Sequence, residues 1–124
     1  MEKKQNYKSL RTFIGAKNFN ESRSFYKDLD FIEIELSNNM SYFRVDDKLG
    51  FYLQKAYVKD WVDNSMLFLE VENIEEYLAK IKSKNLTEKY TRVKLSEIVE
   101  NDWGKEFFLH DPSGILWHIG CFYN

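Results

Sequence analysis

The chain has 124 residues, of which 44% are hydrophobic and 17% aromatic, and its formal net charge is −2. This length can bury one core but not two, so we expect one domain over residues 1–124. The balanced, scattered charge and the short apolar runs predict no nucleic-acid partner, no membrane span, no signal peptide and a cytoplasmic location. The single cysteine, Cys121, excludes an internal disulfide and argues against a cysteine-based metal site.

Two predicted helix starts lie 55 residues apart and indicate an internal repeat. Asn18 precedes Phe19-Asn20-Glu21, and Asn73 precedes Ile74-Glu75-Glu76. An Asn at this position can accept a free backbone amide of the first helical turn. An apolar stretch comes before each Asn, so each copy predicts a strand that leads directly into an amphipathic helix.

Three further strands are expected after each helix. In the first copy they cover 31–36, 41–45 and 51–54, and in the second copy 90–93, 106–109 and 115–122, with 90–93 the weakest. The turn at 111–114 holds the only proline, and 57–65 is the connector. The predicted fold class is therefore α+β, with one βαβββ module at about 9–57 and a second at about 65–123.

Several segments, in their order and repeat spacing, resemble the vicinal oxygen chelate superfamily, which includes glyoxalase I, bleomycin-resistance proteins, fosfomycin-resistance enzymes and extradiol dioxygenases. They are Asn18 to Ser22, Phe25-Tyr26, Trp103-Gly104 and Phe107 through Asp111-Pro112-Ser113-Gly114. The resemblance covers about residues 10–122. It implies the glyoxalase/bleomycin-resistance fold, in which the two modules form a cup-shaped mixed sheet that a second subunit often completes. We therefore expect a homodimer.

The resemblance also implies where a metal would bind. Metal-dependent members carry a His on the first strand and a carboxylate on the last strand of each copy. Here the corresponding positions hold Arg11, Met66 and His118, together with Gln54, or Tyr52 if that strand is shifted by two residues. Arginine cannot coordinate a cation, and methionine and glutamine are poor ligands for a hard divalent ion, so we expect no metal and no cofactor.

The metal-free bleomycin-resistance proteins are the better likeness. Our first hypothesis is a metal-independent protein that binds a small aromatic or amphipathic compound and confers antibiotic resistance by sequestering it. Arg11 would clamp an anionic group, and aromatic rings would stack on the ligand. The expected ligand-binding residues are Arg11, Phe43, Tyr52, Gln54, Trp61, Met66, Trp103 and His118.

Two other hypotheses stay open. In the first, the chain is an enzyme, namely a glyoxalase-like lyase or isomerase or a dioxygenase-related enzyme. This enzyme uses His118 as a base or has a non-standard metal site. In the second, the chain is a domain that binds no ligand and acts through its dimer surface. Each site residue also has a purely structural interpretation: Arg11 as a solvated charge, His118 as a packed histidine, Trp103 as packing for its loop, and Trp61 as cover for a dimer seam.

Overall fold

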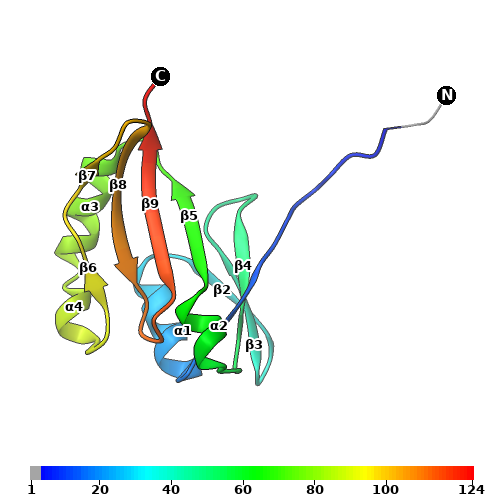
Figure 1. Ribbon diagram of the computed structural model, residues 1–124. Coiled ribbons are helices and arrows are strands. Elements are labelled where there is room, and N and C mark those ends of the chain that lie inside the picture. Colours follow the sequence, from blue (N-terminus) through cyan, green and yellow to red (C-terminus); the bar gives the residue numbers. More distant parts are fainter. Residues whose placement is uncertain (1–3) are drawn as a thin grey trace.

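The computed structural model describes residues 4–124 and contains two mixed sheets that lie side by side (Figure 1). The first sheet has the order β1-β4-β3-β2, in which β1 runs parallel to β4 and the other pairs are antiparallel. The chain enters helix α1 directly after β1. The bounds are β1 (Phe13–Gly15), α1 (Phe19–Asp28), β2 (Ile32–Ser37), β3 (Met40–Arg44) and β4 (Gly50–Gln54).

The second sheet repeats this order as β5-β9-β8-β6, with β7 also paired to β8. Two short strands thus take the place that β2 has in the first sheet. The elements are α2 (Lys59–Asp63), β5 (Met66–Glu70), α3 (Ile74–Ser83), α4 (Leu86–Lys89), β6 (Lys94–Leu95), β7 (Val99–Glu100), β8 (Gly104–His110) and β9 (Leu116–Phe122). The predicted α+β class with two βαβββ modules is confirmed.

Both helix starts form as the sequence predicts. The Asn18 side chain accepts the Glu21 amide at 3.1 Å, and the Asn73 side chain accepts the Glu76 amide at 2.9 Å. The apolar stripes of α1 and α3 are buried against the sheets. Across residues 4–124, no helix has the length and hydropathy needed to cross a membrane.

The weak strand expected at 90–93 does not form. Asn85 takes a left-handed conformation at φ 53°, which stops α3 and lets the short helix α4 follow. Tyr90 then turns inward, where its ring packs edge-on against Phe25 and its hydroxyl donates to Asp28 at 2.6 Å. Strand pairing begins only at Lys94. The predicted connector at 57–65 contains the short helix α2.

One aromatic core joins the two modules on the helix-bearing sides of their sheets. Trp117 of β9 contacts Phe51 of β4 and Tyr26 of α1, with ring centroids 5.4 and 5.8 Å apart. These residues lie on the face of each sheet that carries the helices. The opposite face of each sheet, which we call its front face, therefore points away from the core.

A buried hydrogen-bond network fixes this arrangement. The Tyr26 hydroxyl donates to Asp111 Oδ2 at 2.6 Å and accepts from the Trp117 indole at 3.0 Å. Asp111 Oδ1 accepts the backbone amides of residues 113–115, each at 2.9 Å. Burial raises the pKa of Asp111, whereas the Tyr26 hydroxyl and these amides act to lower it. The network ties α1 of the first module to the β8–β9 turn of the second.

Replacing Tyr26 by Phe should lower the free energy of unfolding by about 1.5–3 kcal/mol, because a buried carboxylate and the Trp117 indole both lose a partner. Chemical denaturation measures this quantity. Tyr123→Phe is the matched control, since Tyr123 is exposed and its hydroxyl makes no hydrogen bond with the described residues, and it should stay within about 0.5 kcal/mol of wild type. Equal stability of the two variants would contradict the role given to Tyr26.

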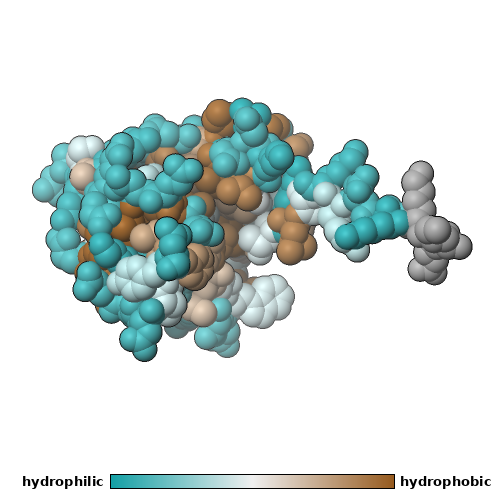
Figure 2. All heavy atoms as spheres, turned by 90° about the horizontal axis from the view of Figure 1, so that it is seen from above, coloured by the Kyte–Doolittle hydropathy of each residue, from teal (hydrophilic) through white to brown (hydrophobic). Residues whose placement is uncertain are grey.

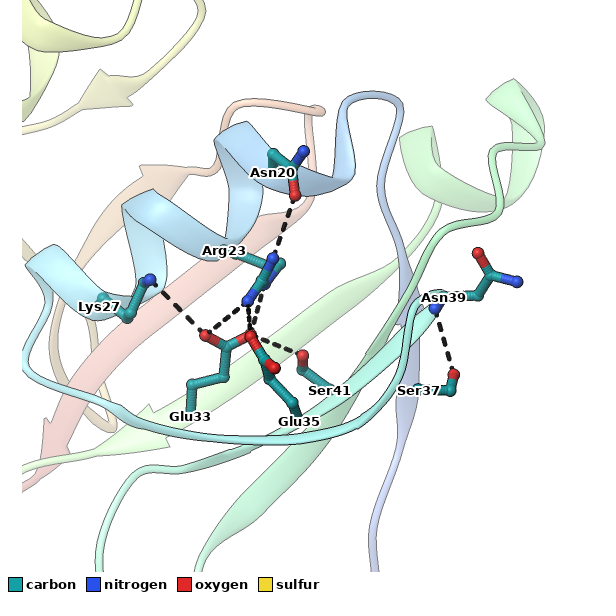
Figure 3. Close-up of polar contacts among 8 residues, drawn as sticks. All are labelled: Asn20, Arg23, Lys27, Glu33, Glu35, Ser37, Asn39 and Ser41. Carbon is teal, nitrogen blue, oxygen red and sulfur yellow. Dashed lines mark hydrogen bonds and ion pairs between the residues drawn. The ribbon is translucent and has the colours of Figure 1, made fainter.

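A second polar cluster holds α1 against β2 (Figure 3). Glu33 accepts hydrogen bonds from Arg23 and from the Ser41 hydroxyl at 2.6 Å, and it forms an ion pair with Lys27 at 3.6 Å. Arg23 also pairs with Glu35. Burial alone would raise the pKa of Glu33, but the hydrogen bonds and positive charges outweigh it and lower the pKa below the usual 4.5. The folded state therefore favours the ionised carboxylate.

A lowered folded-state pKa adds stability that is present above pH 4.5 and is lost as pH falls through the folded value. Glu33→Gln should thus lower the unfolding free energy at pH 7 by about 1–3 kcal/mol and flatten its decline in acid. Denaturation curves between about pH 7 and pH 3 test this. Glu97→Gln, at an exposed ion pair with Lys82, is the control and should follow the wild-type curve. Parallel curves for Glu33→Gln and wild type would contradict the assignment.

Candidate functional site

His118 stands at the centre of the front face of the second sheet. It lies opposite Phe68 of β5 on one side and Phe108 of β8 on the other. The Phe68 ring is nearly parallel to the imidazole at 6.4 Å, and the Phe108 ring meets it edge-on at 5.1 Å. Strand alternation explains the placement, since Trp117 and Ile119 point to the core and His118 between them points outward.

A carboxylate orients the imidazole. His118 Nδ1 lies 2.8 Å from Glu106 Oε1, and the Asn101 side-chain amide donates to Glu106 Oε2 at 2.9 Å. His118 Nε2 lies 3.4 Å from the sulfur of Met66. His110 is on the same face, but burial and then the charge of Lys94 lower its pKa, which favours a neutral ring near pH 7. The contact with Glu106 thus holds the His118 imidazole in one orientation.

Aromatic rings extend the surface beside His118. Phe68, Trp103 and Phe122 contact one another with centroid distances of 5.3 to 5.8 Å, and all three are exposed. Gly120 makes room for this cluster, because a Cβ there would lie 2.8 Å from the Phe68 ring. The result is an exposed apolar surface against which a planar group can pack.

The front face of the first sheet has different chemistry. Arg11 donates to the Tyr52 hydroxyl at 2.9 Å and lies over the Tyr42 ring at 4.3 Å. Phe13 stacks on Tyr52 at 4.5 Å. The exposed side chains of Ile32, Ile34 and Leu36 of β2 add apolar surface. This face can pair a guanidinium with an anionic group while aromatic and aliphatic side chains hold the rest of a ligand.

Strand register decides which first-module residue corresponds to His118. Phe13 pairs with Tyr52 as Phe68 pairs with His118, and both Phe residues stand five positions before their Asn helix caps. The equivalent of His118 is thus Tyr52. Gln54 instead pairs with Gly15.

The family's metal positions are therefore held by Arg11, Tyr52, Met66 and His118. A guanidinium cannot coordinate, and a thioether and a neutral phenol are weak donors for a divalent cation. Within residues 4–124 no three His, Cys, Asp or Glu side chains gather so as to hold a metal ion. These residues do not fit the metal of the metal-dependent members.

The other predicted site residues do not all gather at these faces. Phe43 is 0% exposed and stacks on Phe51 in the core, because it lies on the helix side of β3. Trp61 lies on α2 and is 74% exposed. Its ring packs against no other aromatic ring among the described residues. Arg11 and Tyr52 come together on one front face, and Met66, Trp103 and His118 on the other.

A single chain leaves both front faces open. A cavity of about 500 Å³ follows β5 between the modules, and another of about 510 Å³ lies at the β3–β4 turn. Neither includes Arg11, Tyr52 or His118. Figure 1 shows the described part of the chain before β1 as an extended arm that projects from the body, with its base held where the Tyr52 amide donates to the Thr12 carbonyl at 2.9 Å. Figure 2 shows apolar surface where this arm leaves the body.

Sequence reasoning missed Glu106, Asn101, Phe68 and Phe108. Glu106, Phe108 and His110 alternate along β8 and so share a face, but only the pairing of β8 with β9 brings that face to His118. Phe68 had a clearer signal, since it stands five residues before Asn73 as Phe13 does before Asn18.

Comparison with solved structures identifies the fold. A bleomycin-binding protein from Streptomyces verticillus, complexed with copper(II)-bleomycin, superposes with a TM-score of 0.80 at 15% identity and covers 97% of this chain and 100% of its own. A bleomycin resistance determinant encoded on the transposon Tn5 gives 0.71 at 16% identity, over 94% and 98%. The chain has the vicinal oxygen chelate fold. A lactoylglutathione lyase from Agrobacterium tumefaciens shares this fold, with a TM-score of 0.66 at 10% identity over 90% and 91%.

Sequence comparison alone gives no relative. No family model matches this chain, and no curated protein matches it. The vicinal oxygen chelate fold is thus preserved here at identities of 10% to 16% to the three solved structures.

Proposed function

We propose that this protein binds a small aromatic or amphipathic molecule at its front faces without a metal, and sequesters it. The observation that carries the proposal is the exposure of two aromatic surfaces, each built around a polar group. Soluble domains rarely expose contiguous apolar surface that has no binding role. Arg11 on one face and His118 on the other would each orient a ligand that the rings of the same face hold.

The nature of the structural neighbours supports the same function. Two of them are described as binding or resisting bleomycin, and one of these was solved with its ligand. Metal-independence is supported by the donor set, since Arg11 and Met66 stand where metal-dependent members have histidines. An antibiotic is accordingly one class of compound that this chain would sequester.

An enzymatic function is the second candidate. The contact of His118 with Glu106 favours it, because a histidine held by a carboxylate is a common general base. In this alternative the chain is a lyase or isomerase that takes a proton from its substrate on His118. Turnover of a bound compound would separate this candidate from sequestration.

We further propose that the working unit is a homodimer. Residues 4–12 are exposed along their whole length, and Leu10 in this arm is 99% exposed. The front faces of one chain point away from its core, so a second copy related by two-fold symmetry can close them. Burial of the arm and of the exposed Phe13, Ile32 and Ile34 would supply apolar contact area.

The fluorescent dye 8-anilinonaphthalene-1-sulfonate, which is aromatic, amphipathic and anionic, should bind the folded protein. Trp103→Ala should weaken binding about 3- to 10-fold, because a stacking surface is lost. Arg11→Ala should weaken it further by removing the partner of the sulfonate. Fluorescence titration gives the dissociation constants.

Trp61→Ala is the matched control, since it removes an exposed tryptophan on α2 that contacts no ring of either front face, and it should leave dye binding unchanged. Protein dialysed against EDTA should bind the dye as well as untreated protein. Loss of binding after EDTA, or equal effects of the two tryptophan variants, would overturn the proposed site.

The dimer gives a separate prediction. Light scattering after size-exclusion chromatography should report twice the chain mass of 15.0 kDa. Leu10→Asp should shift the protein toward the monomer, because a charge replaces an apolar contact of the arm. Val58→Asp, at an exposed valine before α2, is the control and should stay dimeric. A wild-type protein that is monomeric at the concentration of the dye assay would rule out the dimer.

A further inference from the structure

The tautomer of His118 follows from its partner. A carboxylate only accepts hydrogen bonds, so the 2.8 Å contact with Glu106 requires the proton on Nδ1. In the neutral imidazole Nε2 then carries a lone pair and no hydrogen. In this neutral form the ring nitrogen that faces away from Glu106 is a hydrogen-bond acceptor.

Glu106 is itself held in place. Its side chain is only 12% exposed, and its second oxygen accepts from the Asn101 amide at 2.9 Å. The Asn101 backbone is fixed in turn, because its amide donates to the Gly104 carbonyl at 2.8 Å. The carboxylate thus has a defined position, and the imidazole plane is set by Glu106 together with Phe68 and Phe108.

The acceptor Nε2 has no strong partner. The Met66 sulfur at 3.4 Å is itself a weak acceptor, so the two atoms are in contact without sharing a hydrogen. Met66 is 64% exposed and flexible, which lets an incoming group displace it. An oriented acceptor therefore lies on the Met66 side of the imidazole, on the front face of the second sheet and beside the exposed Phe68 ring.

We propose that this surface selects planar aromatic ligands that carry an acidic O–H or N–H group, donated to His118 Nε2, and that Glu106 is the positioning residue for this recognition. The inference rests on the proposed function, since it names the ligand class of the same site. It adds a polar requirement that stacking on aromatic rings does not impose. An analogue without the donor hydrogen leaves Nε2 unpaired and binds less tightly.

The probes are 2-naphthol and 2-methoxynaphthalene, which share a ring system and differ in the donor hydrogen. Calorimetric titration at about pH 8, where an ordinary histidine is neutral, should give wild-type protein a preference for 2-naphthol of about 2- to 12-fold. His118→Phe keeps an aromatic ring and should bind both probes equally. Glu106→Gln and Asn101→Ala should each reduce the preference, because Nε2 is then less firmly held as an acceptor.

Nitrogen-15 NMR of the imidazole gives a readout that a purely structural role would not move. The chain has two histidines, so His118→Phe assigns the His118 signals. The wild type should show protonated Nδ1 and unprotonated Nε2, and 2-naphthol but not 2-methoxynaphthalene should shift Nε2. Thermal denaturation checks that each variant is folded.

The outcomes separate this inference from the proposed function. Equal binding of the two probes by wild type, or a proton found on Nε2, would overturn the inference while aromatic binding at the front faces stands. Failure of both probes and of the anilinonaphthalene dye to bind would overturn the proposed function as well.

Discussion

The hydrogen bond from Tyr26 to Asp111 is the constraint on which the rest of the molecule depends. It joins a helix of the first module to a turn of the second inside an aromatic core, where an unpaired carboxylate would be costly. The Trp117 indole completes the network by donating to Tyr26, and its ring packs β9 against the first module. Because the backs of the two sheets are joined in this way, their front faces must point outward.

Outward-facing sheets explain why one fold carries two different half-sites. The same position in the two modules holds Tyr52 in one and His118 in the other, each with a Phe beside it. The first is bonded to Arg11 and the second to Glu106, so one half-site presents a fixed positive charge and the other an oriented imidazole. The two modules therefore share a backbone geometry but differ in the charged and polar groups on their front faces.

The sequence was informative where the physical signal is local. Helix caps at Asn18 and Asn73 and the turn after Asp111 depend on neighbouring residues, and their spacing was enough to predict the α+β fold. The site was less accessible, because it depends on strand register. A register error of two residues along β4 exchanges Gln54 for Tyr52. Phe43 was expected on the ligand-binding face of its strand, but its side chain points to the opposite face and into the core. Glu106 is twelve residues from His118 and becomes visible only once β8 and β9 are paired.

The position of Glu106 also changes what His118 can do. In a metal site the donors converge on one cation, and each uses its lone pair for coordination. Here the carboxylate comes from the neighbouring strand of the same sheet and points at the imidazole itself, so it fixes a proton on Nδ1. The lone pair of Nε2 is left beside the exposed thioether of Met66, on the same sheet face as the Phe68 ring. The position on β9 that the resemblance assigns to a metal ligand thus holds a hydrogen-bond acceptor, Nε2 of the neutral His118 ring.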